Sequence, residues 1–213
     1  MAKTTKNREH KKRELVEIAE KLFINKGFDE TNVEDILVSS GLSKGGFYHY
    51  FKSKDEVLAE SIRYFAEDLL ETIKPVIEDM TLNAIEKLKL FISNKSSSQA
   101  SRRDIIHYMV MLMKSDFTFY KYNIIISQMY IEPLSTIIRQ GCEEGLFNVD
   151  HPVETADILI RAITSVPYSL FYDDYQGDPI KTQKYKEALE DVITRTLGVQ
   201  IQLDLYDRKV EKR

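Results

Sequence analysis

Residues 31–55, TNVEDILVSSGLSKGGFYHYFKSKD, hold the turn and helix signals that decide the fold of this chain. Thr31 and Glu34 have the spacing of a capping box, which starts a helix. Gly41 supplies the left-handed backbone that ends such a helix, and Ser43 is placed to cap the next one. The stretch therefore predicts two short helices joined by a tight turn, with a second capping box at positions 53 and 56 opening a longer helix directly afterwards.

The second short helix is predicted to have two unlike faces. Phe47 and Phe51 give it a buried side, whereas its other side is basic and aromatic. A short helix held in this way by a partner helix across a tight turn is the arrangement that places side chains in the major groove of DNA. The residues expected to contact DNA are Thr31, Asn32, Ser43, Lys44, Gly45, Gly46, Tyr48, His49, Tyr50 and Lys54.

Individual roles follow from the chemistry of these side chains. Lys44, in the first turn, can donate to guanine O6 or N7 or to a phosphate, although a solvated surface lysine is the alternative. Gly45 and Gly46 each cost about 1 kcal/mol in a helix relative to alanine. Glycine is nevertheless expected where the backbone approaches DNA closely, because it has no Cβ to intrude. Tyr48 can donate its hydroxyl to a phosphate or lean on the core. Lys54 adds its charge to the free N–H groups of a helix start, which suits phosphate binding.

Residues 43–55 resemble the signature of the TetR family of bacterial transcriptional regulators. The glycine turn, the Ser-Lys-Gly start, the aromatic run and the Lys-Ser-Lys-Asp helix start occur in register. The resemblance implies a homodimer, a palindromic operator in double-stranded DNA, and a small-molecule effector that releases the DNA, with no cofactor. The family usually carries a polar or small side chain where this chain has Gly46, so base reading is expected to shift toward Lys44 and His49.

The whole-chain composition suits a folded protein of the cytoplasm. Of 213 residues, 43% are hydrophobic and 30% charged, and the single cysteine, Cys142, has no partner for an internal disulfide. No stretch approaches the roughly 18–20 apolar residues of a membrane span, and no apolar run follows the basic N-terminus as in a signal peptide. We therefore expect a cytoplasmic protein with no membrane partner.

Charge is distributed unevenly along the chain. The formal net charge is −4, yet residues 1–13 contain six lysines and arginines against one glutamate, a net of +5. A basic run before the predicted helices is consistent with a phosphate-contacting arm or with a solvated tail, and the sequence leaves both open.

Helical periodicity and the position of breakers predict an all-α chain. We expect a three-helix helix-turn-helix domain over residues 1–53, joined by a long helix to a larger ligand-binding and dimerisation domain over 54–213. Pro75 is expected to end or bend the long helix, and residues 198–213 could be a strand or a frayed tail. Helices are predicted over 8–26 and from 54 onward, and near 82–93, 103–114, 117–145, 152–173 and 180–197, with loops at 93–101 and 173–179.

Two further features bear on ligands and partners. Methionines and aromatic residues, which line adaptable apolar pockets, are concentrated after residue 107, although core packing is the alternative for each one. Arg161 could anchor an anionic group or form a salt bridge. The pocket candidates are Tyr108, Met109, Met113, Phe117, Tyr120, Met129, Tyr130, Arg161, Tyr168 and Phe171.

The last two long helices carry apolar stripes that are expected to form the homodimer interface, with packing in the core of one chain as the alternative. The residues of these stripes are Val153, Ala156, Leu159, Ile160 and Ile163 on one helix, and Tyr185, Ala188, Leu189, Val192 and Ile193 on the other.

The sequence favours a repressor released by a small hydrophobic or aromatic effector. The alternative is a helix-turn-helix protein that binds DNA constitutively and docks a protein through its C-terminal domain. An enzyme is not expected, because no nucleophile elbow, metal cluster or phosphate loop is present. No catalytic residue and no metal ligand is predicted.

Overall fold

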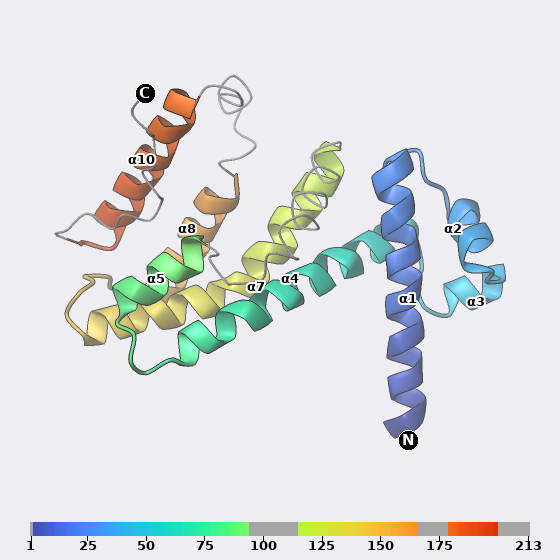
Figure 1. Ribbon diagram of the computed structural model, residues 1–213, viewed down its shortest axis with the longest axis horizontal. Helices are drawn as coiled ribbons and strands as arrows, with labels where there is room; N and C mark the ends of the chain where they lie inside the picture. Colours follow the sequence, from blue (N-terminus) through green and yellow to red (C-terminus); the bar gives the residue numbers. More distant parts are fainter. Residues whose placement is uncertain (1, 94–114, 166–178, 200–213) are drawn as a thin grey trace. The chain divides into compact units, whose positions relative to one another are not determined.

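The computed structural model describes residues 2–93, 115–165 and 179–199, and every regular element in these ranges is a helix. This confirms the all-α fold (Figure 1). Residues form two compact units, one of Met1–Glu67 with Ser98–Ile126 and the other of Asp68–Ser97 with Ser127–Arg213. The helices are α1 (Ala2–Lys26), α2 (Val33–Ser40), α3 (Lys44–Tyr48), α4 (Lys54–Glu78), α5 (Ala84–Ser93), α7 (Asp116–Glu143), α8 (Pro152–Ser165) and α10 (Pro179–Thr196).

The core of the first unit holds the helix-turn-helix together. Phe23 of α1, Ile36 of α2 and Phe47 of α3 are fully buried, and Phe51 is almost so. Each large apolar side chain buried in this way contributes on the order of 1.5–3 kcal/mol. The three-helix core expected from the apolar spacing is therefore present, with α2 and α3 beside α1 (Figure 1).

Helix α1 begins earlier than predicted, at Ala2 instead of residue 8, so the basic N-terminal run is helical. The expected stop is correct. Gly27 adopts a left-handed φ of 93°, and its N–H donates to the Phe23 carbonyl at 2.9 Å. A left-handed backbone with such a bond ends a helix at little steric cost only for glycine.

The remaining helix predictions agree with the structure to within a few residues where the structure describes them. Pro75, which was expected to end or bend the long helix, does not end it, since α4 runs on to Glu78. The predicted helix at 103–114, the loop at 173–179 except its last residue, and residues 200–213 lie outside the described residues.

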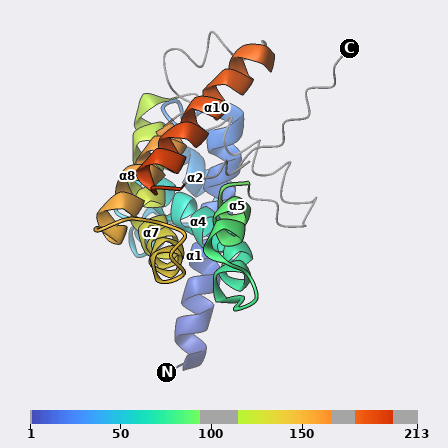
Figure 2. The same ribbon diagram turned by 90° about the vertical axis from the view of Figure 1, so that its left-hand side faces the viewer.

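In the second unit, α8 and α10 lie side by side (Figures 1 and 2). Their inward faces are buried, together with residues of α7. The fully or almost fully buried apolar residues of these three helices include Leu134, Ile137, Ile138, Ala156, Leu159, Ile160 and Ile193. Among the described helices, none combines the length and apolarity that crossing a lipid bilayer requires.

Candidate nucleic-acid interface

Helix α2 starts at a reciprocal cap one residue later than predicted. The Asn32 side chain accepts from the Asp35 N–H at 2.8 Å, and the Asp35 carboxylate accepts from the Asn32 N–H at 2.9 Å. The expected Thr31–Glu34 capping box is therefore wrong. The hydrogen bond to the backbone at Asn32, followed by the one from the Lys26 side chain, lowers the pKa of Asp35 below its ordinary value. Asp35 also ties α2 to the end of α1, since Lys26 Nζ lies 2.6 Å from its carboxylate.

The turn between α2 and α3 is built as predicted. Gly41 has a left-handed φ of 67° and forms the C-cap of α2. Ser43 caps α3, because its hydroxyl oxygen accepts from the Gly46 N–H at 3.1 Å. Together with the burial of Phe47, these caps orient a short α3 whose opposite side faces outward.

The outward side of α3 carries most of the predicted DNA contacts. Ser43, Lys44, Gly45, Tyr48 and His49 are exposed. In the part of the chain that the structure describes, the Lys44 ammonium takes part in no ion pair.

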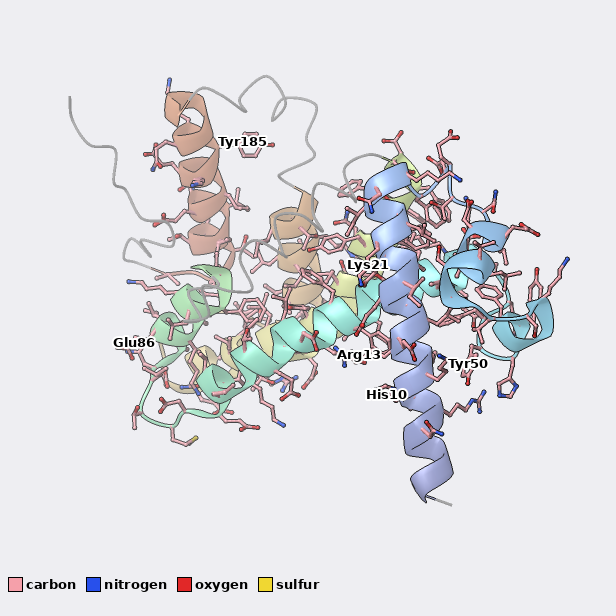
Figure 3. All side chains as sticks on the ribbon, turned by 45° about the vertical axis from the view of Figure 1, so that its right-hand side comes forward. His10, Arg13, Lys21, Tyr50, Glu86 and Tyr185 are labelled. Atoms are coloured by element: carbon pink, nitrogen blue, oxygen red, sulfur yellow. The ribbon has the colours of Figure 1, made fainter. Side chains whose placement is uncertain are left out.

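Four further residues complete the description of this surface. Gly46 and Tyr50 are half-buried, and Asn32 is exposed at the start of α2. Lys52 is also exposed close to α3, although it was not among the expected contacts; its place between Ser43 and Lys54 in a basic stretch was the available signal. Figure 3 shows Tyr50 in the segment that follows α3, and His10, Arg13 and Lys21 along α1.

The two expected glycines differ in their surroundings. A Cβ added to Gly45 would meet nothing within 4 Å, so packing within the chain does not require glycine there. A Cβ on Gly46 would lie 3.3 Å from the Ser43 hydroxyl, which caps the helix. The open space at Gly45 fits a backbone that must approach another molecule closely.

Thr31 cannot serve as the DNA contact that the sequence suggested. It is buried, with only 1% of its surface exposed, and its hydroxyl donates to the Gly27 carbonyl at 2.6 Å. This hydroxyl therefore holds the loop between α1 and α2 in place of contacting DNA.

Lys54 is also engaged within the chain. Its Nζ donates to the carbonyls of Phe28 at 2.8 Å, Asp29 at 3.1 Å and Thr31 at 2.8 Å. An ammonium group has three donors, and each one here has an acceptor. The expected phosphate contact by Lys54 is thus corrected to a role in holding the α1–α2 loop.

The basic residues at the end of the N-terminal run lie in α1 and have partners within the chain. Lys12 Nζ lies 2.6 Å from the Glu60 carboxylate, and Lys11 pairs with Glu14 at 2.9 Å. The Arg13 guanidinium stacks over the Tyr64 ring at 5.0 Å. Burial, followed by the nearby negative charge of Glu60, raises the pKa of Tyr64 to about 12.

The predicted pocket residues that the structure describes differ in their surroundings. Arg161 is exposed and pairs with Asp157 at 2.8 Å, which is the salt bridge weighed as its alternative. Tyr120 is 62% exposed, and Phe117 is stacked on Phe28. Tyr130 is buried against Phe91, and Met129 is half-buried. The candidates Tyr108, Met109, Met113, Tyr168 and Phe171 lie outside the described residues.

The apolar stripes of α8 and α10 divide between core and surface. Ala156, Leu159, Ile160, Leu189 and Ile193 are buried within the chain. A second group is exposed and outward, consisting of Val153, Ala188, Val192 and, in addition to the prediction, Ile158.

Known proteins are similar to this chain in the helix-turn-helix and over most of its length. The family described as bacterial regulatory proteins, tetR family, matches residues 15–61. The transcriptional repressor KstR2 of Mycobacterium tuberculosis is 28% identical over 80% of this chain and 84% of its own length. The repressor DhaR of a Mycobacterium species is 25% identical over 70% of this chain and 76% of its own length.

A solved structure supports the fold. The complex of SmeT with triclosan superposes with a TM-score of 0.61 at 16% identity, covering 91% of this chain and 94% of that one; SmeT is the repressor of the SmeDEF multidrug efflux pump of Stenotrophomonas maltophilia. The relatives are transcriptional regulators, so this chain is a DNA-binding regulator and not an enzyme. The family match over residues 15–61 and the relatives similar over most of the chain support its membership of the TetR family of bacterial regulatory proteins.

Proposed function

We propose that the chain is a transcriptional repressor that binds a palindromic operator through α3 and leaves it when a small hydrophobic or aromatic molecule binds. The observation that carries this proposal is the exposed set of Lys44, Tyr48 and His49 on a helix anchored by the buried Phe47. A face with donors of this kind can contact base edges and phosphates in the major groove. In this proposal residues 1–53 are the DNA-binding domain and residues 54–213 the ligand-binding and dimerisation domain.

The DNA contacts proposed are a subset of those expected from the sequence. Thr31 and Lys54 are left out because their polar atoms are engaged within the chain. Lys52 joins as an exposed cation. The proposed contacts are Asn32, Ser43, Lys44, Gly45, Gly46, Tyr48, His49, Tyr50 and Lys52.

Release by a small molecule is supported by the chemistry of the second unit and by the relatives. Tyr130 and Phe91 form a buried edge-to-face pair with centroids 5.9 Å apart, and Met129 lies beside Tyr130 in sequence. Aromatic rings and thioethers suit an apolar or aromatic ligand. KstR2 and DhaR are repressors, and SmeT forms a complex with triclosan.

The proposed dimer forms through the outward faces of α8 and α10. Val153, Ile158 and Val192 are 43%, 64% and 49% exposed, and lie on two neighbouring helices. Symmetric pairing would bury them against a second copy and set two α3 helices about one DNA turn, roughly 34 Å, apart. Ile158→Asp should therefore give a monomer in light scattering. Met80→Asp is the matched control, because Met80 is exposed and apolar in the same unit but lies off these helices. A dimeric Ile158→Asp, or an equally disrupted Met80→Asp, would refute this interface.

The function is tested by letting the purified protein select duplexes from a random library and then challenging the complex with a panel of hydrophobic compounds. We expect a selected palindrome, and at least one compound that both raises the melting temperature of the protein and releases the duplex. Selective binding that no stabilising compound disturbs would favour the constitutive DNA-binding protein. Failure to enrich any duplex would refute DNA recognition itself.

A further inference from the structure

Phe28 lies where three helices meet, in the loop just before α2. Its buried ring meets the Phe23 ring of α1 edge-on, with centroids 5.2 Å apart. It is stacked on the Phe117 ring of α7, with centroids 5.7 Å apart and 21° between the planes. Lys54 Nζ of α4 lies 4.5 Å from the centroid of the Phe28 ring. One loop residue of the first unit is therefore held by α1, α4 and α7 together.

The loop around Phe28 leads directly into the helix-turn-helix. The Phe28 carbonyl accepts from the Thr31 N–H at 3.2 Å as well as from Lys54, and Asn32, the next residue, is the cap of α2. Because this loop is short and internally hydrogen-bonded, the position of Phe28 sets where α2 starts. Because the turn between α2 and α3 is capped at Gly41 and Ser43, a shift of α2 also shifts α3.

Two of the three helices at Phe28 extend beyond the first unit. Lys54 is the first residue of α4, and Phe117 lies in the first turn of α7. Both helices continue from residues of the first unit into residues of the second. Helix α7 also brings Lys121, whose Nζ lies 5.4 Å from the centroid of the Phe117 ring. The stack of Phe117 on Phe28 thus joins the start of α7 to the loop that leads into α2.

We propose that Phe117 is a positioning residue for DNA binding, which couples the start of α7 to α2 and α3 through its stack on Phe28. This inference rests on the proposed function, because it takes α3 as the element that binds DNA. By the reciprocity of linkage, DNA held at α3 must change the surroundings of Phe117, just as a displacement of α7 must change DNA affinity. An effector that moves α7 would therefore act on DNA through this contact.

The chain contains no tryptophan, so a single introduced indole reports on one site. We would replace Phe117 with tryptophan and follow its emission while adding a duplex that the wild-type protein selected from a random library. We expect Phe117→Trp to shift its emission with the same midpoint as duplex binding. Tyr120→Trp is the matched control, since Tyr120 lies one turn along α7 and is 62% exposed, and its emission should stay constant.

The outcomes separate this inference from the proposed function. If the wild-type protein selects no duplex, the proposed function fails. If Phe117→Trp binds the duplex without a change in emission, or if Tyr120→Trp changes equally, the coupling is refuted while DNA binding stands.

A double-mutant cycle covers the case in which the tryptophan variant does not fold. Phe117→Leu should weaken duplex binding about two- to ten-fold, the range that a lost aromatic pair implies. In a Phe28→Leu background the same substitution should have little effect, because its partner ring is already gone. Independent, multiplying effects of the two substitutions would overturn the proposal.

Discussion

Replacing Lys54 with methionine tests whether this lysine holds a loop or touches DNA. The substitution keeps most of the aliphatic stem but removes three hydrogen bonds to the carbonyls of Phe28, Asp29 and Thr31 and the contact with the Phe28 ring. Two of these hydrogen bonds are part-buried and are worth about 1–1.5 kcal/mol each, whereas water can replace the exposed one. With about 0.5–1 kcal/mol for the cation over the ring, the free energy of unfolding should fall by about 2.5–4 kcal/mol.

Two measurements distinguish the roles. Urea unfolding gives the loss of stability, and duplex binding over a range of salt concentrations gives the number of phosphate contacts. Lys54→Met should be less stable and should bind more weakly, with an unchanged slope of log K against log salt. Lys52→Met is the matched control: its side chain is exposed, so stability should be unchanged and the slope should fall by about 1.

The opposite pattern would refute the reasoning. If Lys54→Met unfolds at the wild-type urea concentration while its salt slope falls by about 1, Lys54 contacts phosphate as the sequence alone had suggested. The three carbonyls would then have no need of its ammonium group.

Three further predictions concern the interface and its supports. Lys44→Ala should lose about 1–3 kcal/mol on the selected duplex and much less on random DNA; equal losses on both would contradict base reading. The pKa of Asp35 is lowered, so its contribution to stability is present above the ordinary value of 3.8 and is lost as pH falls through its lower folded value. Acid unfolding of Asp35→Asn should show less of this dependence, and a profile identical to wild type would count against the cap. The pKa of Tyr64 is raised to about 12, so the folded state holds this proton more tightly and stability should fall between pH 10 and 12. The ultraviolet titration of Tyr64→Phe should lack one tyrosine step near pH 12 that the wild-type protein shows, and an unchanged titration would contradict the assignment.

The sequence predicted the turn between α2 and α3 well because its signals are local. Gly41 permits a left-handed backbone, and Ser43 caps the helix that follows it. Phe47 and Phe51 stand one helical turn apart and are both buried, as their spacing predicts. Features of this kind depend on neighbours within a few residues, and single-residue chemistry decides them.

The α2 cap was misplaced by one residue because Thr31 and Asn32 are both good capping residues with an acid three positions later. What decides between them is the Gly27 carbonyl, which takes the Thr31 hydroxyl and leaves the cap to Asn32. A contact with the end of the preceding helix cannot be read from the capping pattern alone.

The role of Lys54 could not be predicted for a similar reason. A lysine at a helix start suits an external phosphate and an internal carbonyl equally well. The choice depends on where the α1–α2 loop folds, and that loop lies 23–26 residues away in sequence. The stack between Phe28 and Phe117 spans a greater separation still, and aromatic composition gave no sign of it.

The central claim is that the exposed face of α3 enters a DNA groove, and a hydroxyl-radical footprint on the selected duplex tests it most directly. We expect two protected patches about one helical turn apart. A double variant that carries both Lys44→Ala and Tyr48→Ala should lose this protection. Full protection with both side chains removed, or protection without two-fold symmetry, would contradict the account.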